Sequence, residues 1–295
     1  MLAKSPFSRD ALDALLDGPD TAVLAVIAGV EGPSYRPVGS MMTVLSDSDW
    51  AGTLSSGCIE ADISLHAMQI SQGCTPRHLR YGRGSPFVDI QLPCGGGLDI
   101  LLLPAPDRAV LRALKDNRLA RIPCALRIDA ETGLMEIVAP TATARTGAHL
   151  TILFEPDIRF VIFGKRPEAS AFAALVQAAG YPNLLVSPDD ETLNAGAQAG
   201  CETKHIVRQA FPEDVEADAR TAIILFFHDH DWEPPILVGA LRTEAFYIGA
   251  QGSQRARDAR LMELQALGVG TDDMARLHGP VGLIPSARDA HTLAV

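Results

Sequence analysis

The chain has 295 residues with a net charge of −11, and 47% of its residues are hydrophobic but only 5% aromatic. This length allows two domains, each with its own core. The acidic balance excludes a nucleic-acid partner, because phosphate recognition needs a basic surface. The first residues lack the apolar segment of a signal peptide, and apolar runs such as "TAIILFF" are far too short to span a membrane. We therefore expect a cytoplasmic protein with no membrane partner.

The first half of the chain predicts an α+β domain. Apolar runs rich in β-branched residues predict strands, and amphipathic spacing predicts helices. A helix is expected near the N-terminus, a hairpin over 40–54 and a helix that begins near Cys58 and runs through 71. The other predicted elements are strands over 21–30, 76–81, 89–93 and 98–104, a helix over 107–117 and a hairpin over 124–138. Residues 152–158 are expected to bridge to the second half, so that the domains are 1–156 and 157–295.

The second half alternates apolar strands with helices. Strands are predicted over 159–164, 183–187, 205–207, 221–227 and 245–250. Strands that are apolar on both faces and alternate with helices indicate a parallel sheet covered on both sides. The predicted fold class is therefore α/β, with an N-terminal α+β domain followed by a Rossmann-like, doubly wound parallel sheet.

The turn after the first of these strands departs from the G-x-G-x-x-G pattern of dinucleotide-binding folds. Gly164 occupies the first glycine position, but Arg166 replaces the second and Ala169 the third. The second glycine normally lets the backbone approach a pyrophosphate. We therefore interpret this turn as structural and regard NAD(P) binding as doubtful. Lys165, Arg166 and the following helix N-terminus still favour an anion.

Two further polar stretches follow predicted strands, at the edge where open α/β sheets bind ligands. The first comprises His228, Asp229 and His230. The second comprises Gly249, Gly252, Ser253 and Arg255. An anion cradle and ordinary helix capping remain alternatives for the second stretch. A His-x-His pair without a third fixed ligand is a weak metal motif, so no metal site is predicted.

The five cysteines include no C-x-x-C pair, which argues against a zinc site and a disulfide framework. Cys58 follows Gly57 at the expected start of a helix, where a thiol has a lowered pKa. Cys94 precedes Gly95 and Gly96, where the backbone is free to approach a flat ligand. The loop before the hairpin adds Arg36 as a candidate binding residue. The remaining cysteines are expected to be buried thiols: Cys74, Cys124 and Cys201.

These motifs together resemble the xanthine dehydrogenase accessory family, XdhC/CoxI. The resemblance runs through "EGPSYRPVGSMMTVLSDSDWAGTLSSGCIEADI", "PCGGGLDILLLP", "HDH" and "YIGAQGSQRAR". It implies a non-catalytic chaperone that binds molybdenum cofactor transiently, protects it and inserts it into an apo molybdenum hydroxylase. A cysteine desulfurase is an implied partner, and a homodimer is open. The cysteine motifs of the family fall on Cys58 and Cys94.

Two other functions remain as alternatives. An NAD(P)-binding oxidoreductase would use the second domain as its scaffold, although the altered glycine turn argues against it. A purely structural partner protein would bind no ligand. Because a carrier needs reversible binding rather than bond breaking, no catalytic residue is assigned.

Overall fold

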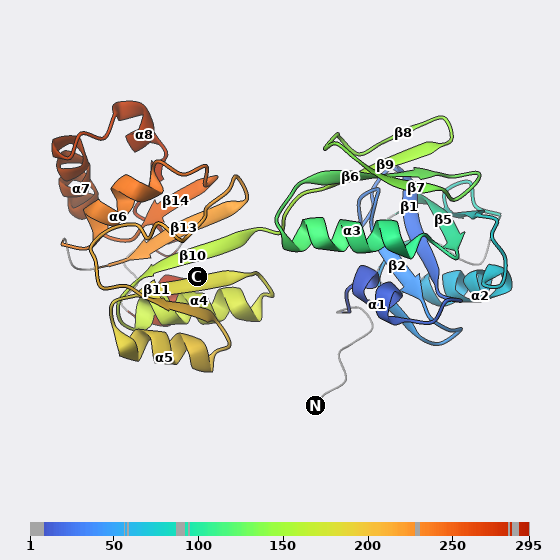
Figure 1. Ribbon diagram of the computed structural model, residues 1–295, viewed down its shortest axis with the longest axis horizontal. Helices are drawn as coiled ribbons and strands as arrows, with labels where there is room; N and C mark the ends of the chain where they lie inside the picture. The colour runs from blue at the N-terminus through green and yellow to red at the C-terminus, as the bar shows by residue number, and fades with distance from the viewer. Residues whose placement is uncertain are drawn as a thin grey trace. The chain divides into compact units, whose positions relative to one another are not determined.

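The computed structural model describes residues 9–55, 57, 59–86, 92–93, 95–227, 231–282, 284 and 289–294. The chain divides into two compact units, Met1–Pro156 and Asp157–Val295 (Figure 1). Within the described ranges, every helix is too short or too polar to cross a bilayer.

The first unit is built on two antiparallel sheets. The five-stranded sheet has the order β3-β2-β1-β5-β4 and the four-stranded sheet the order β7-β6-β9-β8. The strands of the first sheet are β1 (Val23–Glu31), β2 (Met41–Val44), β3 (Trp50–Gly52), β4 (Arg77–Gly82) and β5 (Gly97–Pro104). Those of the second are β6 (Cys124–Asp129), β7 (Met135–Val138), β8 (Ala144–Thr146) and β9 (His149–Phe154). The helices are α1 (Ala11–Asp17), α2 (Glu60–Ile70) and α3 (Arg108–Leu119).

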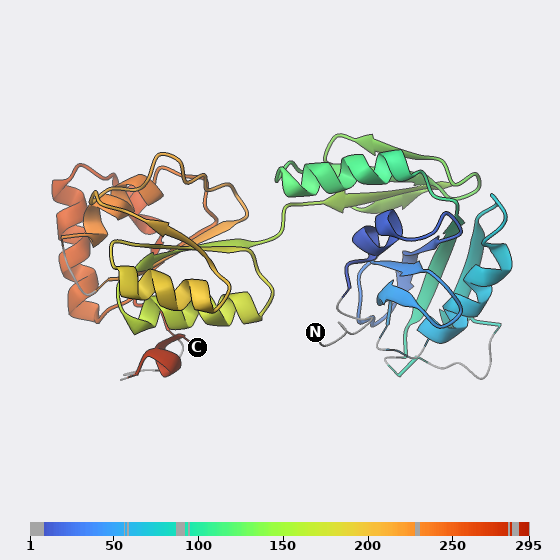
Figure 2. The same ribbon diagram turned by 60° about the horizontal axis from the view of Figure 1, so that its bottom comes forward.

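The five-stranded sheet is buried on both faces. Alternate residues of β1 point to opposite sides, as the two-residue period of a strand requires. Leu24 and Val26 pack in a core with α1, α3 and the four-stranded sheet. Val23 and Ala25 pack instead with α2 and with Leu54. Figure 2 shows α2 and α3 as separate layers of this unit.

The second unit is a six-stranded parallel sheet with the order β12-β11-β10-β13-β14-β15. Its strands are β10 (Arg159–Gly164), β11 (Asn183–Ser187), β12 (Glu202–His205), β13 (Thr221–Phe226), β14 (Tyr247–Ala250) and β15 (Leu277–His278). Its helices are α4 (Pro167–Ala178), α5 (Asp190–Gln198), α6 (Glu233–Ala240), α7 (Gln254–Ala266), α8 (Thr271–Ala275) and α9 (Ala290–Ala294). Numbered from β10, this is the 3-2-1-4-5-6 order of dinucleotide-binding folds.

Helices cover both faces of this sheet. Ile162 of β10 packs in a core with Ala173 of α4. Its neighbours Val161 and Phe163 face the opposite core, which contains residues of α6 and α7. From β10 the chain adds β11 and β12 on one side of the sheet and then β13, β14 and β15 on the other. Such a change of direction, here between β10 and β13, creates a crevice at the carboxyl ends of the two strands.

The predicted fold class is confirmed, and four local predictions need correction. Residues 152–154 belong to β9 rather than to a bridge. Strand β12 precedes the apolar residues 206–207 on which the prediction rested, because an exposed edge strand needs no apolar run. Helix α2 begins at Glu60, two residues after Cys58. Of the predicted strand over 89–93, residues 89–91 lie outside the described residues, and residues 92–93 belong to no strand.

Candidate functional site

The turn between β10 and α4 keeps the close packing of a dinucleotide-binding turn. A β-carbon on Gly164 would lie 2.8 Å from the β-carbon of Ala169 and 2.8 Å from the carbonyl oxygen of Phe226. Ala169 is buried, so the third position of the pattern still needs a small residue. Pro167 is the first residue of α4, where its missing N–H leaves no hydrogen bond unmade.

Arg166 adopts a backbone conformation that belongs to glycine. Its φ is 72° and its ψ is −174°, a region that residues with a β-carbon enter only at a free-energy cost of about 1–3 kcal/mol. The Arg166 N–H donates a hydrogen bond to the Thr192 hydroxyl at 2.7 Å. Arg166 therefore has a backbone conformation that favours glycine, as expected for the second glycine position of the G-x-G-x-x-G pattern. Its N–H, however, is hydrogen-bonded to Thr192.

Asp189, at the N-terminus of α5, completes this network. Its Oδ2 accepts hydrogen bonds from the main-chain N–H of Thr192 at 2.9 Å and from the Thr192 hydroxyl at 2.5 Å. These hydrogen bonds lower the pKa of Asp189, and the positive charges of Arg166 and Lys165 lower it further. Asp189 is thus an ionised helix cap, and its capping oxygen is occupied by Thr192.

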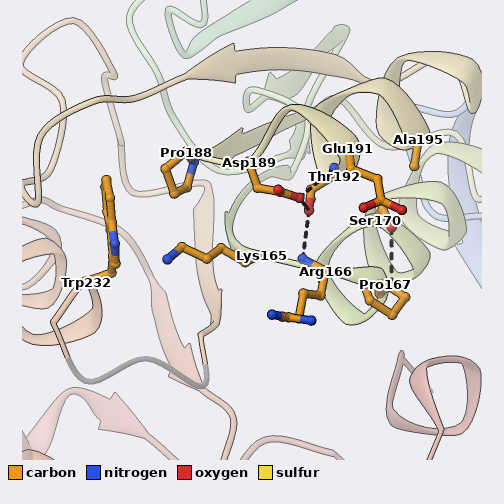
Figure 3. A pocket seen from close by; sticks show the side chains of 10 residues that line it. All are labelled: Lys165, Arg166, Pro167, Ser170, Pro188, Asp189, Glu191, Thr192, Ala195 and Trp232. Carbon is orange, nitrogen blue, oxygen red and sulfur yellow. Dashed lines mark hydrogen bonds between the residues drawn. The ribbon is translucent and has the colours of Figure 1, made fainter.

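A pocket of about 720 Å³ opens over these turns (Figure 3). Lys165, Arg166, Asp189, Glu191, Thr192 and Trp232 are among the residues that line it. The Lys165 ammonium lies 5.1 Å from the centre of the Trp232 ring, within the range of a cation–π contact. The Arg166 side chain is exposed, and Figure 3 shows it pointing away from Asp189. Two cations and the N-terminus of α4 therefore face a crevice that also contains carboxylates.

A buried arginine, Arg260, stabilises the turn after β14. Arg260 is 2% exposed; its Nε donates to Glu233 Oε2 at 2.9 Å and its Nη2 to the Gln251 carbonyl at 2.6 Å. Glu233, itself 3% exposed, is the first residue of α6. This ion pair ties the start of α6 to the turn before α7. Such a pair is destabilising to break, because a buried charge would be left uncompensated.

The predicted residues of this second turn divide between strand and helix. Gly249 lies inside β14, where a β-carbon would come within 2.6 Å of the Tyr247 ring, so close packing rather than turn geometry explains this glycine. Gly252 has φ 138°. Ser253 caps α7 by accepting the Ala256 N–H at 3.2 Å. Arg255 is exposed in the first turn of α7.

In the first unit, Gly95 and Gly96 differ in their surroundings. Gly95 has φ 71° and nothing within 4 Å of the position of a β-carbon. At Gly96 a β-carbon would lie 2.0 Å from the carbonyl oxygen of Pro33, so only glycine fits against this loop. Arg36 follows in the same loop and is exposed. Gly57 has φ 99°. The turn that contains Gly95 and Gly96 therefore packs against the loop that contains Arg36, as a site formed by both would require.

Several predicted site residues lie outside the described residues: Cys58, Cys94, His228, Asp229 and His230. Their positions relative to the other predicted residues stay predictions. The expectation of a buried thiol is wrong for Cys74, which is exposed, whereas Cys124 and Cys201 are buried. Burial raises the pKa of the Cys201 thiol. Across the parts of the chain that the structure describes, no three His, Cys, Asp or Glu side chains are grouped to hold a metal ion.

Sequence reasoning missed Thr192, Trp232 and Arg260. Thr192 follows Asp189 by three residues, a capping pattern that was available in the sequence. Trp232 comes directly after the polar stretch at 228–231, but nothing local indicates that its ring meets Lys165. The role of Arg260 depends on a contact across 27 residues with Glu233, which the sequence does not show.

The fold and these turns define a two-unit protein whose second unit is Rossmann-like, with a modified phosphate turn. Residues 160–295 match the family described as XdhC Rossmann domain, and residues 15–82 match the XdhC and CoxI family. The chain belongs to the XdhC/CoxI family.

Similar proteins cover nearly the whole chain. It is 36% identical over 290 residues to the molybdenum cofactor insertion chaperone PaoD of Escherichia coli (strain K12), covering 97% of this chain and 84% of that protein. It is 23% identical over 319 residues to a protein of Bacillus subtilis (strain 168) described as a probable component of xanthine dehydrogenase, covering 96% and 93%. The crystal structure of a xanthine dehydrogenase from Bacillus halodurans has a TM-score of 0.77 at 23% identity, covering 96% of this chain and 91% of that one. This last similarity supports the fold.

Proposed function

We propose that this protein binds molybdenum cofactor and inserts it into an apo molybdenum hydroxylase of the xanthine dehydrogenase type. The observation that carries the proposal is the 36% identity to PaoD, which extends through both units. The cofactor is cargo, held transiently and released to the client enzyme. No bond-making step is required of the chain, so its residues need only bind, shield and release.

The cargo-binding residues are proposed on the glycine turns and the loops beside them. In the first unit they are Arg36, Gly57, Cys58, Cys94, Gly95 and Gly96. The open space at Gly95 supports this assignment, because it lets the main chain approach a flat ring system. A thiolate is a suitable ligand for a soft metal centre, so Cys58 and Cys94 are proposed to contact the molybdenum end.

In the second unit the proposed contacts are electrostatic. Lys165, Arg166 and the N-terminus of α4 favour a phosphate group of the cargo. The other proposed residues of this unit are Gly164, His228, Asp229, His230, Gly249, Gly252, Ser253 and Arg255. Glu191 also lines the crevice, so a dianionic ligand must approach from the side of the two cations.

The test is native mass spectrometry of the protein expressed in a host that makes molybdopterin. We expect a pterin adduct on the wild-type protein that is lost in Cys58→Ala and Cys94→Ala. Cys74→Ala is the matched control, since Cys74 is an exposed thiol outside the proposed site. A wild-type protein without pterin would refute the proposal.

We further propose that the protein binds a cysteine desulfurase and forms a homodimer. Crosslinking with the desulfurase tests the first of these, and light scattering tests the second.

An NAD(P)-binding oxidoreductase is the second candidate. The strand order of the second unit and its 720 Å³ crevice favour it. Against it, the Arg166 N–H and the Asp189 capping oxygen both engage Thr192. Titration calorimetry with NADH and NADPH distinguishes the two functions, because the oxidoreductase requires saturable binding of one of them.

A further inference from the structure

The crevice at the end of β10 contains an aromatic ring, Trp232, to which the proposed function assigns no role. Trp232 is half-buried and lines this pocket of about 720 Å³, a volume within the usual range of small-molecule sites. Its ring stacks on that of Phe227, with the centroids 6.2 Å apart and an angle of 15° between the planes. Phe227 is 4% exposed and belongs to the core of the second unit. The core therefore fixes the plane of the Trp232 ring at the wall of the pocket.

Lys165 lies against the Trp232 ring and beside the turn that would receive an anion. Its ammonium is 5.1 Å from the centre of the ring, and Figure 3 shows the Lys165 side chain extending toward the ring. A cation–π contact at a partly exposed site is weak, so a ligand can replace it. A bound phosphate would attract the same ammonium. The ring would then be available to a flat group of the same ligand.

The polar part of the crevice suits one phosphate group better than a pyrophosphate. Helix α4 has 12 residues and begins at Pro167, and its N-cap residue Arg166 makes no side-chain capping hydrogen bond. The positive end of this helix and two cationic side chains favour an anion. The Arg166 N–H, which a pyrophosphate would need, is donated to Thr192. Glu191 is exposed and also lines the pocket, so its carboxylate repels a second phosphate.

We propose that this crevice binds a flat heterocycle that carries one phosphate group, with the ring stacked on Trp232 and the phosphate held by Lys165 and Arg166. In the view of Figure 3 the two cations lie between Trp232 and Ala195, which gives the ring and the phosphate separate places. Two ligands have this chemistry: the phosphorylated pterin of the cargo and a free mononucleotide. The inference goes beyond the proposed function, because it assigns Trp232 to the ring and holds for either source.

Titration calorimetry of the purified protein at low salt is the test. The probes are hydroxymethylpterin phosphate, AMP and the same two compounds without phosphate. We expect saturable binding of at least one phosphorylated probe and at least about tenfold weaker binding of its unphosphorylated counterpart, as the loss of hydrogen bonds to a charged group implies. Tighter binding of the pterin phosphate identifies the ligand as the cargo, whereas tighter binding of AMP identifies a separate nucleotide. Trp232 fluorescence should be quenched in the same titrations, measured in a Trp50→Phe background because Trp50 is the other tryptophan of the chain.

Variants separate the ring contact from the phosphate contact. Trp232→Leu should weaken binding of the phosphorylated probe about 5- to 150-fold, because stacking of a base on an aromatic side chain contributes this much. Trp232→Phe keeps a ring and should retain most of the affinity. Lys165→Met should weaken the phosphorylated probe and reduce its dependence on salt, while the unphosphorylated probe is unaffected. Trp50→Phe is the matched control: Trp50 lies in β3 of the first unit and is not among the described residues that line the pocket, so this variant should keep every wild-type affinity.

The inference is overturned if neither phosphorylated probe binds the wild-type protein at millimolar concentration, or if a folded Trp232→Leu protein binds as tightly as Trp232→Phe. Should Trp232→Leu fail to fold, Trp232 quenching and the Lys165→Met titration decide, and the absence of both effects overturns it. Tighter binding of NAD than of either monophosphate overturns it as well, since the crevice would then accept a pyrophosphate. Failure of the proposed function is a separate result. Protein from a host that makes molybdopterin would carry no pterin, while the purified protein would still bind a phosphorylated probe.

Discussion

Replacing Arg166 by glycine should make the second unit more stable. At φ 72° and ψ −174° a side chain costs about 1–3 kcal/mol, and glycine removes this strain. The greater freedom of glycine in the unfolded chain offsets about 0.4–1 kcal/mol. Among the described residues the exposed Arg166 guanidinium has no hydrogen bond or salt bridge, so its loss changes stability by only about 0.5 kcal/mol. The central values of these terms give an expected net gain of about 1 kcal/mol.

Arg166→Ala separates strain from charge. Alanine removes the guanidinium but keeps the β-carbon, so it should show no gain, and the two variants differ by that one carbon. Urea unfolding is followed through Trp232 in a Trp50→Phe background, because the chain has only these two tryptophans. A gain of 1 kcal/mol corresponds to a melting-temperature increase of about 2–4 °C for a domain of this size. Equal stability of the glycine and alanine variants would refute the argument from strain.

The same pair of variants tests whether the strained conformation of Arg166 contributes to ligand binding. If the Arg166 guanidinium holds an anionic ligand, Arg166→Gly should be better folded and yet bind that ligand less tightly. Misfolding cannot produce this combination. Strained residues of this kind persist where the surrounding structure enforces them, and they cluster at ligand sites. A variant that is more stable and binds as well as the wild-type protein would make the strain a structural accident.

Three further outcomes follow from the contacts described above. Gly164→Ala should destabilise the second unit by about 1–3 kcal/mol by overpacking, as measured by denaturant unfolding; an unchanged midpoint would contradict the packing at this turn. Asp189→Asn should lower stability at neutral pH. Because the folded-state pKa of Asp189 is lowered, the difference from the wild-type protein should begin to shrink near the unfolded-state pKa of about 4 and be lost as pH falls further, through the lower folded-state pKa. A difference that persists at pH 2 would show that the cap, not the charge, is responsible. Iodoacetamide should modify exposed Cys74 in the native protein but buried Cys201 only after unfolding, because burial also raises the pKa of Cys201; peptide mass spectrometry gives both rates.

The sheet of the second unit could be predicted because its central strands are apolar on both faces. β13, for instance, is buried at every residue. The edge strand β12 was placed too late because it has polar residues, Glu202 to His205, that no periodicity distinguishes from a loop. Short-range capping at Ser253 was also predictable, since the donor and acceptor lie three residues apart. The reason for glycine at position 249, in contrast, is not predictable, because the sequence does not show that the Tyr247 ring packs against it.

The Arg166 turn shows a different limit of sequence reasoning. The replacement of a glycine suggests that its backbone conformation has been lost, yet the structure retains it. The reason lies 26 residues away, where the Thr192 hydroxyl accepts the Arg166 N–H. Such a contact depends on two turns that meet only after the parallel sheet has formed. Neither turn contains a pattern that identifies the other.

This contact also determines how the crevice would recognise an anion. In a dinucleotide-binding turn, main-chain N–H groups at the helix N-terminus face the pyrophosphate. Here the Arg166 N–H is donated to Thr192, while Arg166 and Lys165 place two cationic side chains along the same pocket. Binding through exposed charges is screened by salt, whereas binding through preorganised amides in a buried turn is screened much less. An anion held here should therefore lose affinity steeply with ionic strength, and under the proposed function this loss would favour release of the cargo.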